Sequence, residues 1–311
     1  MTGAIFFDVE CALPWAFAVP AVQGAAHQLA PGTERIVNYH LVTDGRATVR
    51  VPGAGELRVA AGDVVVLPHD HPHTVCGDRF STVVESSIPL AEVLSGRPRA
   101  VRLGGKGSRT HIICGFFGCE RLADRSFLAG LPPVFAVNLR TDDAGRWLEN
   151  SVRHLSVEAQ SRRPGTAALL SKMAQVLFVE TLRRYMADLP TGAVGWLAGA
   201  RDPLVGGALS LLHRDPARPW TLAKLAREAG ASRSVLGERF SALLGESPLA
   251  YLTRWRLQLA ARLLETTAKT ALQIAIDVGY GSESTFNRAF KRELGIPPAR
   301  YRRKHETWVG R

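Results

Sequence analysis

The chain has 311 residues, of which 46% are hydrophobic and 22% charged, and it carries a net charge of +11. This length exceeds one ordinary hydrophobic core, so we expect at least two domains, and the composition excludes a largely disordered chain. No apolar run reaches membrane-spanning length and the N-terminus lacks the pattern of a signal peptide, so we expect a cytoplasmic protein without a membrane partner. The four cysteines are too sparse for a disulfide framework.

The positive charge is concentrated near the C-terminus. Residues 195–311 contain 19 Lys and Arg against 10 Asp and Glu, a net +9, whereas the preceding residues carry only +2. Such a field attracts polyanions and contributes salt-dependent affinity for nucleic acid. A solvated surface or a contact with an anionic membrane would also account for the charge, so charge alone does not decide the function.

Short strands are predicted over the first part of the chain. Segments rich in β-branched residues alternate there with turn dipeptides such as Asp44-Gly45 and Pro52-Gly53. This spacing indicates a small antiparallel barrel or sandwich. The predicted strands cover residues 37–42, 46–51, 56–59, 63–67, 81–85 and 110–114.

Near Gly145 the pattern changes from strand to helix. Residues 167–185 carry apolar side chains at three-to-four spacing, which is typical of a strongly apolar helix. This helix either packs on the barrel of its own chain or also forms a dimer interface, and the sequence leaves a homodimer open. Residues 190–199 have the composition of a linker to the basic segment.

The C-terminal part contains an internal repeat with an offset of 49 residues before a turn and 50 after it. Each copy has a small residue where two helices cross, a glycine that ends the first helix in the left-handed conformation, and a serine that caps the second. The matched pairs are Ala226 with Ala275, Gly230 with Gly279, Ser232 with Ser282, Phe240 with Phe290, Gly245 with Gly295 and Pro248 with Pro298.

This pattern predicts two helix-turn-helix units. Their second helices, residues 232–244 and 282–294, have one apolar face, to which Val235 is assigned, and an opposite face that is polar and basic. The helix predicted between the units, residues 248–265, would be about 27 Å long, comparable to one turn of DNA, about 34 Å. One monomer could therefore place two reading helices in adjacent major-groove segments of double-stranded DNA.

Residues 202–303 resemble the DNA-binding domain of the AraC/XylS family of bacterial regulators. The second-unit signature stands here as AIDVGYGSESTFNRAFKRELGIPPARY, residues 275–301. The resemblance implies a transcription regulator with RNA polymerase as a partner, and base contacts from the early part of each recognition helix. The DNA-binding residues implied are Arg233, Ser234, Glu238 and Arg239 in the first unit, and Glu283, Ser284, Asn287 and Arg288 in the second.

The two recognition helices are not equivalent. Gly237 has no side chain and can only allow close approach, so we expect the second helix to hold more of the base-specific contacts. A further set of basic residues is better suited to phosphate oxygens than to bases. This set consists of Arg233, Arg239, Arg254, Lys291 and Arg292.

The strand-rich part resembles the cupin-type sensor domain found on some AraC-like regulators. Residues 62–73, GDVVVLPHDHPH, match the second cupin motif, but the first motif retains only His40. We therefore expect a multidomain α+β protein that is not an enzyme. The expected domains are a cupin-like sensor barrel over residues 1–144, linker helices with a possible dimer contact over 145–200, and an all-α tandem helix-turn-helix domain over 201–305.

The interior of a small barrel can hold one ligand. A mixed nitrogen and sulfur set would suit Zn²⁺ or another divalent metal there, if its members converge. An organic effector without a metal, or no ligand at all, are alternatives that the sequence leaves open, and no cofactor is required. The candidate metal ligands are His40, His69, His73 and Cys114.

Taken together, these patterns predict a ligand-responsive, sequence-specific DNA-binding transcription factor. An effector would bind one arrangement of the protein better than another and so bias DNA affinity or contact with the polymerase. Two other classes stay open at this point. A cupin dioxygenase or isomerase fused to a DNA-targeting module would need a competent metal site, and an architectural DNA binder would use its barrel only for dimerisation.

Overall fold

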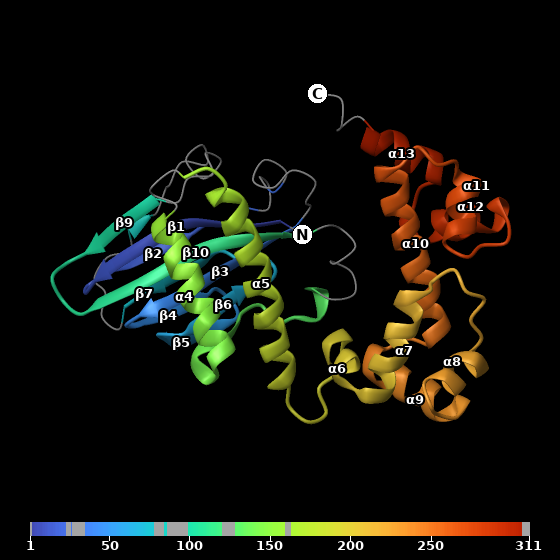
Figure 1. The fold of residues 1–311 in the computed structure, drawn as a ribbon, viewed down its shortest axis with the longest axis horizontal. Helices are drawn as coiled ribbons and strands as arrows, with labels where there is room; N and C mark the ends of the chain where they lie inside the picture. Colours follow the sequence, from blue (N-terminus) through green and yellow to red (C-terminus); the bar gives the residue numbers. More distant parts are fainter. Residues whose placement is uncertain are drawn as a thin grey trace. The chain divides into compact units, whose positions relative to one another are not determined.

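The computed structural model describes residues 2–22, 26, 35–77, 84–85, 99–119, 128–158 and 163–306. The chain divides into two compact units, Met1–Asp188 and Leu189–Arg311. The first unit contains two β-sheets and two long helices, whereas the described part of the second unit is helical (Figure 1). This is the multidomain α+β organisation that the sequence predicts.

The first unit is built from a six-stranded and a five-stranded sheet whose facing sides share one apolar core. Their strand orders are β11-β6-β3-β10-β1-β9 and β5-β4-β7-β2-β8. The six-stranded sheet consists of β1 (Thr2–Ala12), β3 (Arg35–Asp44), β6 (Asp63–Leu67), β9 (Arg99–Gly104), β10 (Arg109–Cys119) and β11 (Phe135–Asn138). The five-stranded sheet consists of β2 (Ala16–Val19), β4 (Arg46–Val51), β5 (Gly55–Ala60), β7 (His73–Cys76) and β8 (Val84–Glu85).

Most neighbouring strands are antiparallel, while β9 runs parallel to β1 and β8 parallel to β2. Strands β3, β4, β5, β6 and β10 contain the predicted segments. Of the strand predicted over residues 81–85, residues 81–83 lie outside the described residues, and Val84–Glu85 form β8. Strands β1, β2, β7, β9 and β11 were not predicted.

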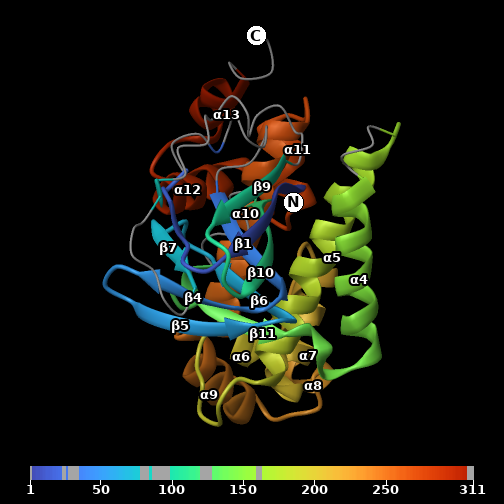
Figure 2. The same ribbon diagram turned by 90° about the vertical axis from the view of Figure 1, so that its left-hand side faces the viewer.

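Helices α4 (Asp143–Glu158) and α5 (Thr166–Ala187) lie on the outer face of the six-stranded sheet, as both ribbon views show (Figures 1 and 2). Phe178 of α5 packs there on Phe117 of β10, with ring centroids 4.6 Å apart. Two short 3-10 helices flank β11 in the chain, η2 (Leu128–Gly130) before it and η3 (Leu139–Thr141) after it. Both long helices therefore belong to the first unit, and the chain divides after Asp188 rather than into a separate linker over residues 145–200.

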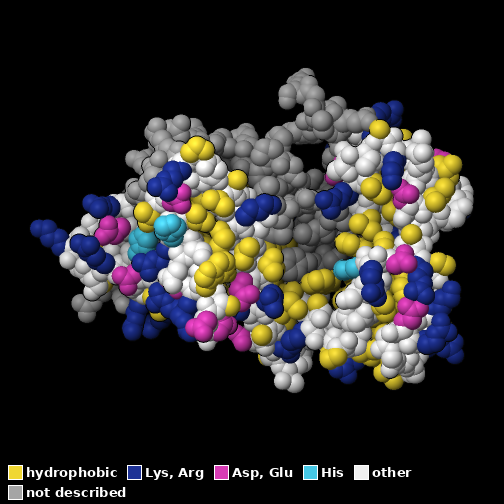
Figure 3. Space-filling model, in the orientation of Figure 1, with side chains coloured by type: hydrophobic (Ala, Val, Ile, Leu, Met, Phe, Trp, Pro, Cys, Tyr) yellow, Lys and Arg dark blue, Asp and Glu magenta, His cyan; other side chains and the backbone are white. Residues whose placement is uncertain are grey.

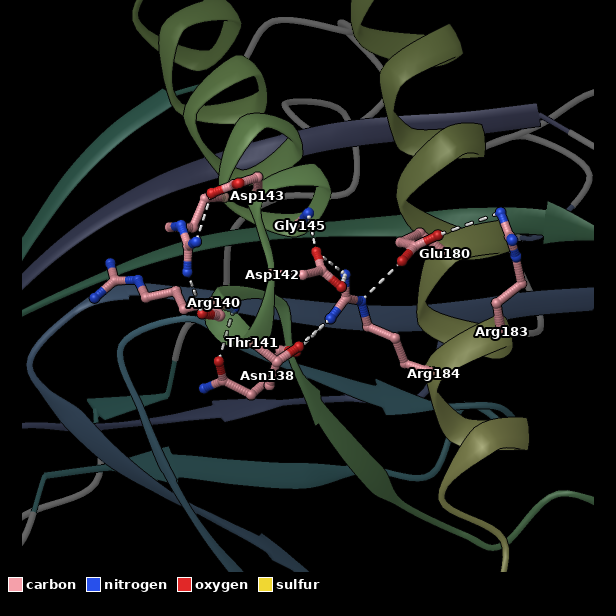
Figure 4. A network of polar contacts seen from close by, with 10 residues as sticks. Asn138, Arg140, Thr141, Asp142, Asp143, Gly145, Glu180, Arg183 and Arg184 are labelled. Atoms are coloured by element: carbon pink, nitrogen blue, oxygen red, sulfur yellow. Dashed lines mark hydrogen bonds and ion pairs between the residues drawn. The ribbon is translucent and has the colours of Figure 1, made fainter.

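A polar network joins the start of α4 to α5 (Figure 4). The Arg184 guanidinium donates to both carboxylate oxygens of Asp142 at 2.8 Å and pairs with Glu180 at 2.9 Å. Gly145 lets the helix approach this network, because a Cβ there would lie 1.9 Å from the Leu139 carbonyl oxygen. The network anchors the end of α5 that lies nearest the boundary with the second unit.

The second unit contains two hydrophobic cores, one for each repeat. Phe240 lies in the first core and Phe290 in the second, both fully buried, and one long helix contributes side chains to both. The helices are α6 (Trp196–Arg201), α7 (Pro203–Arg214), α8 (Leu222–Glu228), α9 (Arg233–Leu244), α10 (Pro248–Thr266), α11 (Ala271–Asp277), α12 (Glu283–Leu294) and α13 (Pro298–Glu306). No helix in the described ranges is long and apolar enough to cross a membrane.

The two predicted helix-turn-helix units are α8–α9 and α11–α12. Gly230 and Gly279 end their first helices with φ of 77° and 89°, in the left-handed region. The side chains of Ser232 and Ser282 cap the second helices by accepting from backbone N–H groups three residues on. Helix α10 runs between the units as the predicted spacer, one residue longer than expected.

Candidate functional site

The recognition helix of the first unit, α9, exposes most of the residues predicted to read DNA. Arg233, Ser234 and Glu238 are exposed on it. Gly237 is partly buried, and a Cβ added to it would meet only Leu222, at 3.9 Å. The exposed face of helix α9 therefore carries one cation, one hydroxyl and one carboxylate, and Gly237, between Ser234 and Glu238, adds no side chain to it.

Arg239 lies differently from the other predicted residues of α9. Its Nε and Nη2 donate to Asp202 Oδ2 at 2.7 and 2.6 Å, while Asp202 Oδ1 caps α7 by accepting from the N–H groups of Leu204 and Val205. Burial raises the pKa of Asp202, but the Arg239 guanidinium and the two backbone N–H groups lower it further, so the net shift is downward. Arg239 thus ties α9 to the beginning of α7.

The recognition helix of the second unit, α12, exposes Glu283, Ser284 and Arg288. Asn287 is partly buried, and its Oδ1 is shielded from solvent without a hydrogen-bond partner among the described residues. The structure therefore brings three of the four predicted residues to the surface of α12. Asn287 is the exception, since its amide oxygen is shielded from solvent.

The residues predicted to touch phosphates fall into two groups. Arg233, Lys291 and Arg292 are exposed. Arg254 forms an ion pair with Glu246 and lies 5.2 Å from the centre of the Tyr251 ring, and Arg239 is paired as described above. Lys and Arg side chains also gather around α8 (Figure 3). The helical unit thus keeps exposed cations next to both recognition helices.

Val235 was wrongly assigned to the apolar face of α9. Its side chain is 50% exposed, beside Ser234 on the surface of the helix. An apolar side chain at such a position can contact the methyl group of thymine. The repeat itself held the signal that the sequence analysis missed, because the equivalent residue of the second unit is the polar Thr285.

In the first unit, three of the four predicted metal ligands meet in the core between the sheets. His40 of β3 is opposite Cys114 of β10, and its Nδ1 lies 3.0 Å from Cys114 Sγ. Its Nε2 lies 2.7 Å from the Nε2 of His73 in β7, on the other sheet. We call these three residues the His–His–Cys cluster. Its members are buried in an otherwise apolar core.

The contacts fix the protons of the His–His–Cys cluster. The Nδ1 of His73 lies 2.9 Å from the His71 carbonyl oxygen, which can only accept, so His73 carries its proton on Nδ1 and its Nε2 must accept. His40 then donates from Nε2 to His73, which leaves its Nδ1 to accept from the Cys114 thiol. All three groups are satisfied in their neutral forms.

Burial favours these neutral forms. It lowers the pKa of His40, with a further contribution from His73, and lowers that of His73 to about 4. Burial also raises the pKa of the Cys114 thiol. The cluster is therefore a neutral chain of polar groups inside the core, and the two ring nitrogens of His40 are its centre.

His69 does not join the cluster. Its Nε2 lies 2.9 Å from the carbonyl oxygen of Leu131. The backbone between His69 and His73 is not a regular strand, because Asp70 has a positive φ of 53°, which breaks the alternation of an extended segment. Cys114 and His73 also lie on opposite edges of the His40 ring, and no group of three metal-binding side chains converges within the described ranges.

Comparison with known proteins agrees with both parts of the chain. Residues 1–187 match a family model described as Cupin, and residues 225–304 match one described as Helix-turn-helix domain. A putative AraC-like transcription regulator of Streptomyces lividans is 38% identical over 274 residues, 88% of each chain. The transcriptional regulator AlkR of Acinetobacter baylyi is 29% identical over 274 residues, 85% of this chain and 87% of the relative. The RCS-specific transcriptional activator RclR of Escherichia coli is 30% identical over 286 residues, 91% of this chain and 90% of the relative.

Proposed function

Because this chain belongs to the AraC-like transcription regulators, we propose that it reads two adjacent major-groove segments of one duplex through α9 and α12, under the control of an effector bound by the cupin domain. The observation that carries this proposal is the duplication itself. Both units have the same caps, the same left-handed turn and an exposed polar face on the second helix. A chain with one reading helix would not need the second copy.

The direct test is selection of DNA by the purified protein. Random fragments retained by the full chain are sequenced, with and without added metabolites. The proposal expects an enriched site made of two short elements about one helical turn apart, 10–10.5 base pairs. Fragments that share a single short element would contradict reading by two helices.

The exposed residues of the two recognition helices fall into two groups, one suited to contacts with bases and one to contacts with the DNA backbone. Arg288 of α12 can donate two hydrogen bonds to a guanine edge, and Glu238 of α9 can accept from cytosine. Arg233, Lys291 and Arg292 are exposed and would donate to phosphate oxygens, contacts that set register without reading sequence. With Gly237 in α9, the second helix carries more of the base-specific contacts.

The effector acts through the His–His–Cys cluster. A buried polar network in an apolar core lowers the cost of placing a polar ligand there, and such networks are candidate functional sites. The groups that an effector would meet are the thiol of Cys114 and the imidazoles of His40 and His73. By binding one conformation of the first unit better than another, it would shift the population that binds DNA.

Two classes of effector would suit the His–His–Cys cluster, a divalent metal and an organic molecule. A divalent metal such as Zn²⁺ would be held by the Nε2 atoms of His40 and His73, which are ligands of the kind that zinc prefers. Cys114 could join them only after the His40 ring turns, because it lies at the other ring nitrogen. An organic effector would instead replace one hydrogen bond of the cluster with its own.

Two matched variants separate these forms. His73→Ala removes a member of the cluster, and His69→Ala removes a neighbouring histidine that bonds outside it. Loss of effector-dependent DNA binding in His73→Ala alone supports the cluster as the sensor, whereas equal responses in both variants contradict it. Elemental analysis then decides the form: a metal retained by wild type and lost in His73→Ala identifies a metal effector, and equal metal contents exclude it.

The protein is proposed to act as a homodimer in the cytoplasm, with RNA polymerase as its partner in transcription. Helix α5 carries three exposed apolar residues along one stripe, Leu169, Val176 and Val179, each 45–55% exposed. Hydrophobic side chains gather over α4 and α5 in the space-filling view (Figure 3). Sedimentation of Val176→Glu tests the dimer, since a wild-type dimer that persists unchanged in this variant would rule out the α5 stripe.

No catalytic role is proposed for the cupin domain. A dioxygenase or isomerase would need several ligands around one metal, and the first cupin motif retains only His40. Turnover of candidate substrates by the purified protein would contradict this. An architectural role, with a barrel that only dimerises, is disfavoured by the cost of keeping a polar cluster in the core.

A further inference from the structure

Residues 215–219 lie in the loop that leads from α7 into α8 of the first helix-turn-helix unit, and a residue of the connecting helix holds them. Arg256 of α10 donates from Nε to the Pro216 carbonyl oxygen at 2.7 Å and from Nη2 to the Arg218 carbonyl oxygen at 2.8 Å. Two carbonyl oxygens of one loop thus accept hydrogen bonds from one planar guanidinium group. This fork fixes the direction of the loop as well as its distance from α10.

The turn of the second unit packs on the same loop. A Cβ added to Gly279 would lie 2.6 Å from the Ala217 carbonyl oxygen, 2.8 Å from Ala217 Cα and 2.8 Å from Arg256 Nη2. Gly230, at the equivalent place in the first unit, has nothing within 4 Å of its added Cβ. The contact is therefore specific to the second turn and is not a general requirement of the motif.

The loop is also bonded to α8. The Arg218 guanidinium donates to both carboxylate oxygens of Glu228 in α8, at 2.9 and 2.5 Å, and lies 4.3 Å from the centre of the Trp220 ring. Trp220 in turn donates from Nε1 to the Asp215 carbonyl oxygen at 2.9 Å. The loop is thereby fastened to α8, the helix on which the recognition helix α9 packs.

We propose that Arg256, residues 215–219 and Gly279 form an inter-unit clamp that sets the angle between α9 and α12, and with it the spacing of the two DNA segments that one monomer can read. The two helix-turn-helix units have separate cores, so without these contacts they would be joined only through α10. The inter-unit clamp adds a second connection and removes rotation about α10. This inference rests on the proposed reading of two segments.

A rigid connection between the two units makes DNA affinity depend on the spacing of the two segments, which a contact that only stabilises the fold would not do. When two binding modules are joined stiffly, affinity is highest at one separation of their sites and falls steeply at others, whereas a flexible joint gives a lower and flatter dependence. One inserted base pair also turns the second segment about a tenth of a helical turn. The dependence of affinity on spacing therefore measures the stiffness of the connection between the units.

The test uses the full chain and the duplex it selects from random DNA, together with derivatives that carry one base pair more or fewer between the two segments. Arg256→Gln is compared with Arg262→Gln. Both remove one positive charge from α10, but Arg262 is exposed and lies six residues after Arg256, about 9 Å further along the helix. The control therefore corrects for the loss of nonspecific attraction to DNA.

Wild type and Arg262→Gln are expected to lose about tenfold or more in affinity when the spacing changes by one base pair, and Arg256→Gln to lose no more than about threefold. An Arg256→Gln profile that matches the Arg262→Gln profile would overturn the clamp. If Arg256→Gln does not fold, Gly279→Ala disturbs the same contact without a change of charge, because its Cβ would lie 2.6 Å from the Ala217 carbonyl oxygen; Gly230→Ala is its matched control, and the same two results apply to this pair. A wild type indifferent to spacing would also overturn the clamp, because it would mean that the units are joined flexibly. The reading of two segments fails separately, if scrambling either segment of the selected duplex leaves the affinity of wild type unchanged, and this is measured before any variant is compared.

Discussion

The two turn glycines offer a sharp test of how the second unit packs. Gly230 and Gly279 have the same role and nearly the same φ, 77° and 89°. Alanine at either position must adopt the left-handed conformation, which costs about 1–2 kcal/mol. At Gly279 the new Cβ would also lie 2.6 Å from the Ala217 carbonyl oxygen, and forced repacking of this kind typically adds about 1–3 kcal/mol.

We therefore expect Gly230→Ala to lower the free energy of unfolding of the helical unit by about 1–2 kcal/mol and Gly279→Ala by about 2–5 kcal/mol. The assay is chemical denaturation of the full chain, with the helical transition followed by circular dichroism and fitted separately from that of the first unit. Equal losses in the two variants would refute the packing of the second turn on residues 215–219. A larger loss in Gly230→Ala would refute it as well.

Three further predictions concern reading, packing and acid stability. Arg288→Ala should weaken specific binding by about 1–3 kcal/mol and relax preference at one base pair, as binding to a set of single-base variants of the selected site would show, while an unchanged preference removes Arg288 from the reading residues. Phe290→Ala, at a fully buried site, should destabilise the helical unit by about 3–5 kcal/mol in the same denaturation assay, and a loss below about 1 kcal/mol would contradict its place in the core. Burial raises the pKa of Asp8, but the hydrogen bond and charge of His111 lower it further, to a net value below 3.8. The Asp8 carboxylate thus stabilises the first unit above about pH 4, and this contribution is lost as the pH falls through the lowered pKa. Below about pH 4, the free energy of unfolding should therefore fall less steeply with falling pH in Asp8→Asn than in wild type. Equal slopes in the two proteins would contradict this role of Asp8.

The helix-turn-helix units could be predicted almost to the residue because their signals are local. The caps Ser232 and Ser282, and the left-handed Gly230 and Gly279, act on backbone groups within three or four positions of themselves. Strands β3, β4 and β6 were found for the same reason, since their β-branched runs lie between clear turns. Strand β1 was missed because its residues alternate irregularly around a bulge between Ile5 and Phe7.

The parts of the sites that sequence did not predict depend on contacts between distant residues. Arg239 pairs with Asp202, 37 positions away, and no pattern around Arg239 indicates that partner. The His–His–Cys cluster depends on the register that sets Cys114 opposite His40, which only the assembled sheet determines. His69 was misplaced because one left-handed residue, Asp70, is held by hydrogen bonds from Asn38 and Val22 that lie far away in the chain.

The boundary between the two units also depends on contacts between residues distant in the sequence. The predicted linker over residues 145–200 starts at a real change of pattern, at the beginning of α4. What the local pattern does not contain is that Phe178 and Arg184 fasten α5 to the first unit. Long-range packing therefore decides to which unit a helix belongs, while its local sequence decides only that it is a helix.

The central claim is that one monomer reads two adjacent segments of DNA through α9 and α12. A methylation-interference footprint on the selected duplex tests it most directly, because methyl groups on guanine N7 lie in the major groove that these helices would enter. The account predicts two clusters of interfering bases on one side of the duplex, about 10 base pairs apart, with interference at one guanine of the cluster assigned to α12 disappearing in Arg288→Ala. A single cluster of interfering bases, or two clusters that both persist unchanged in Arg288→Ala, would contradict it.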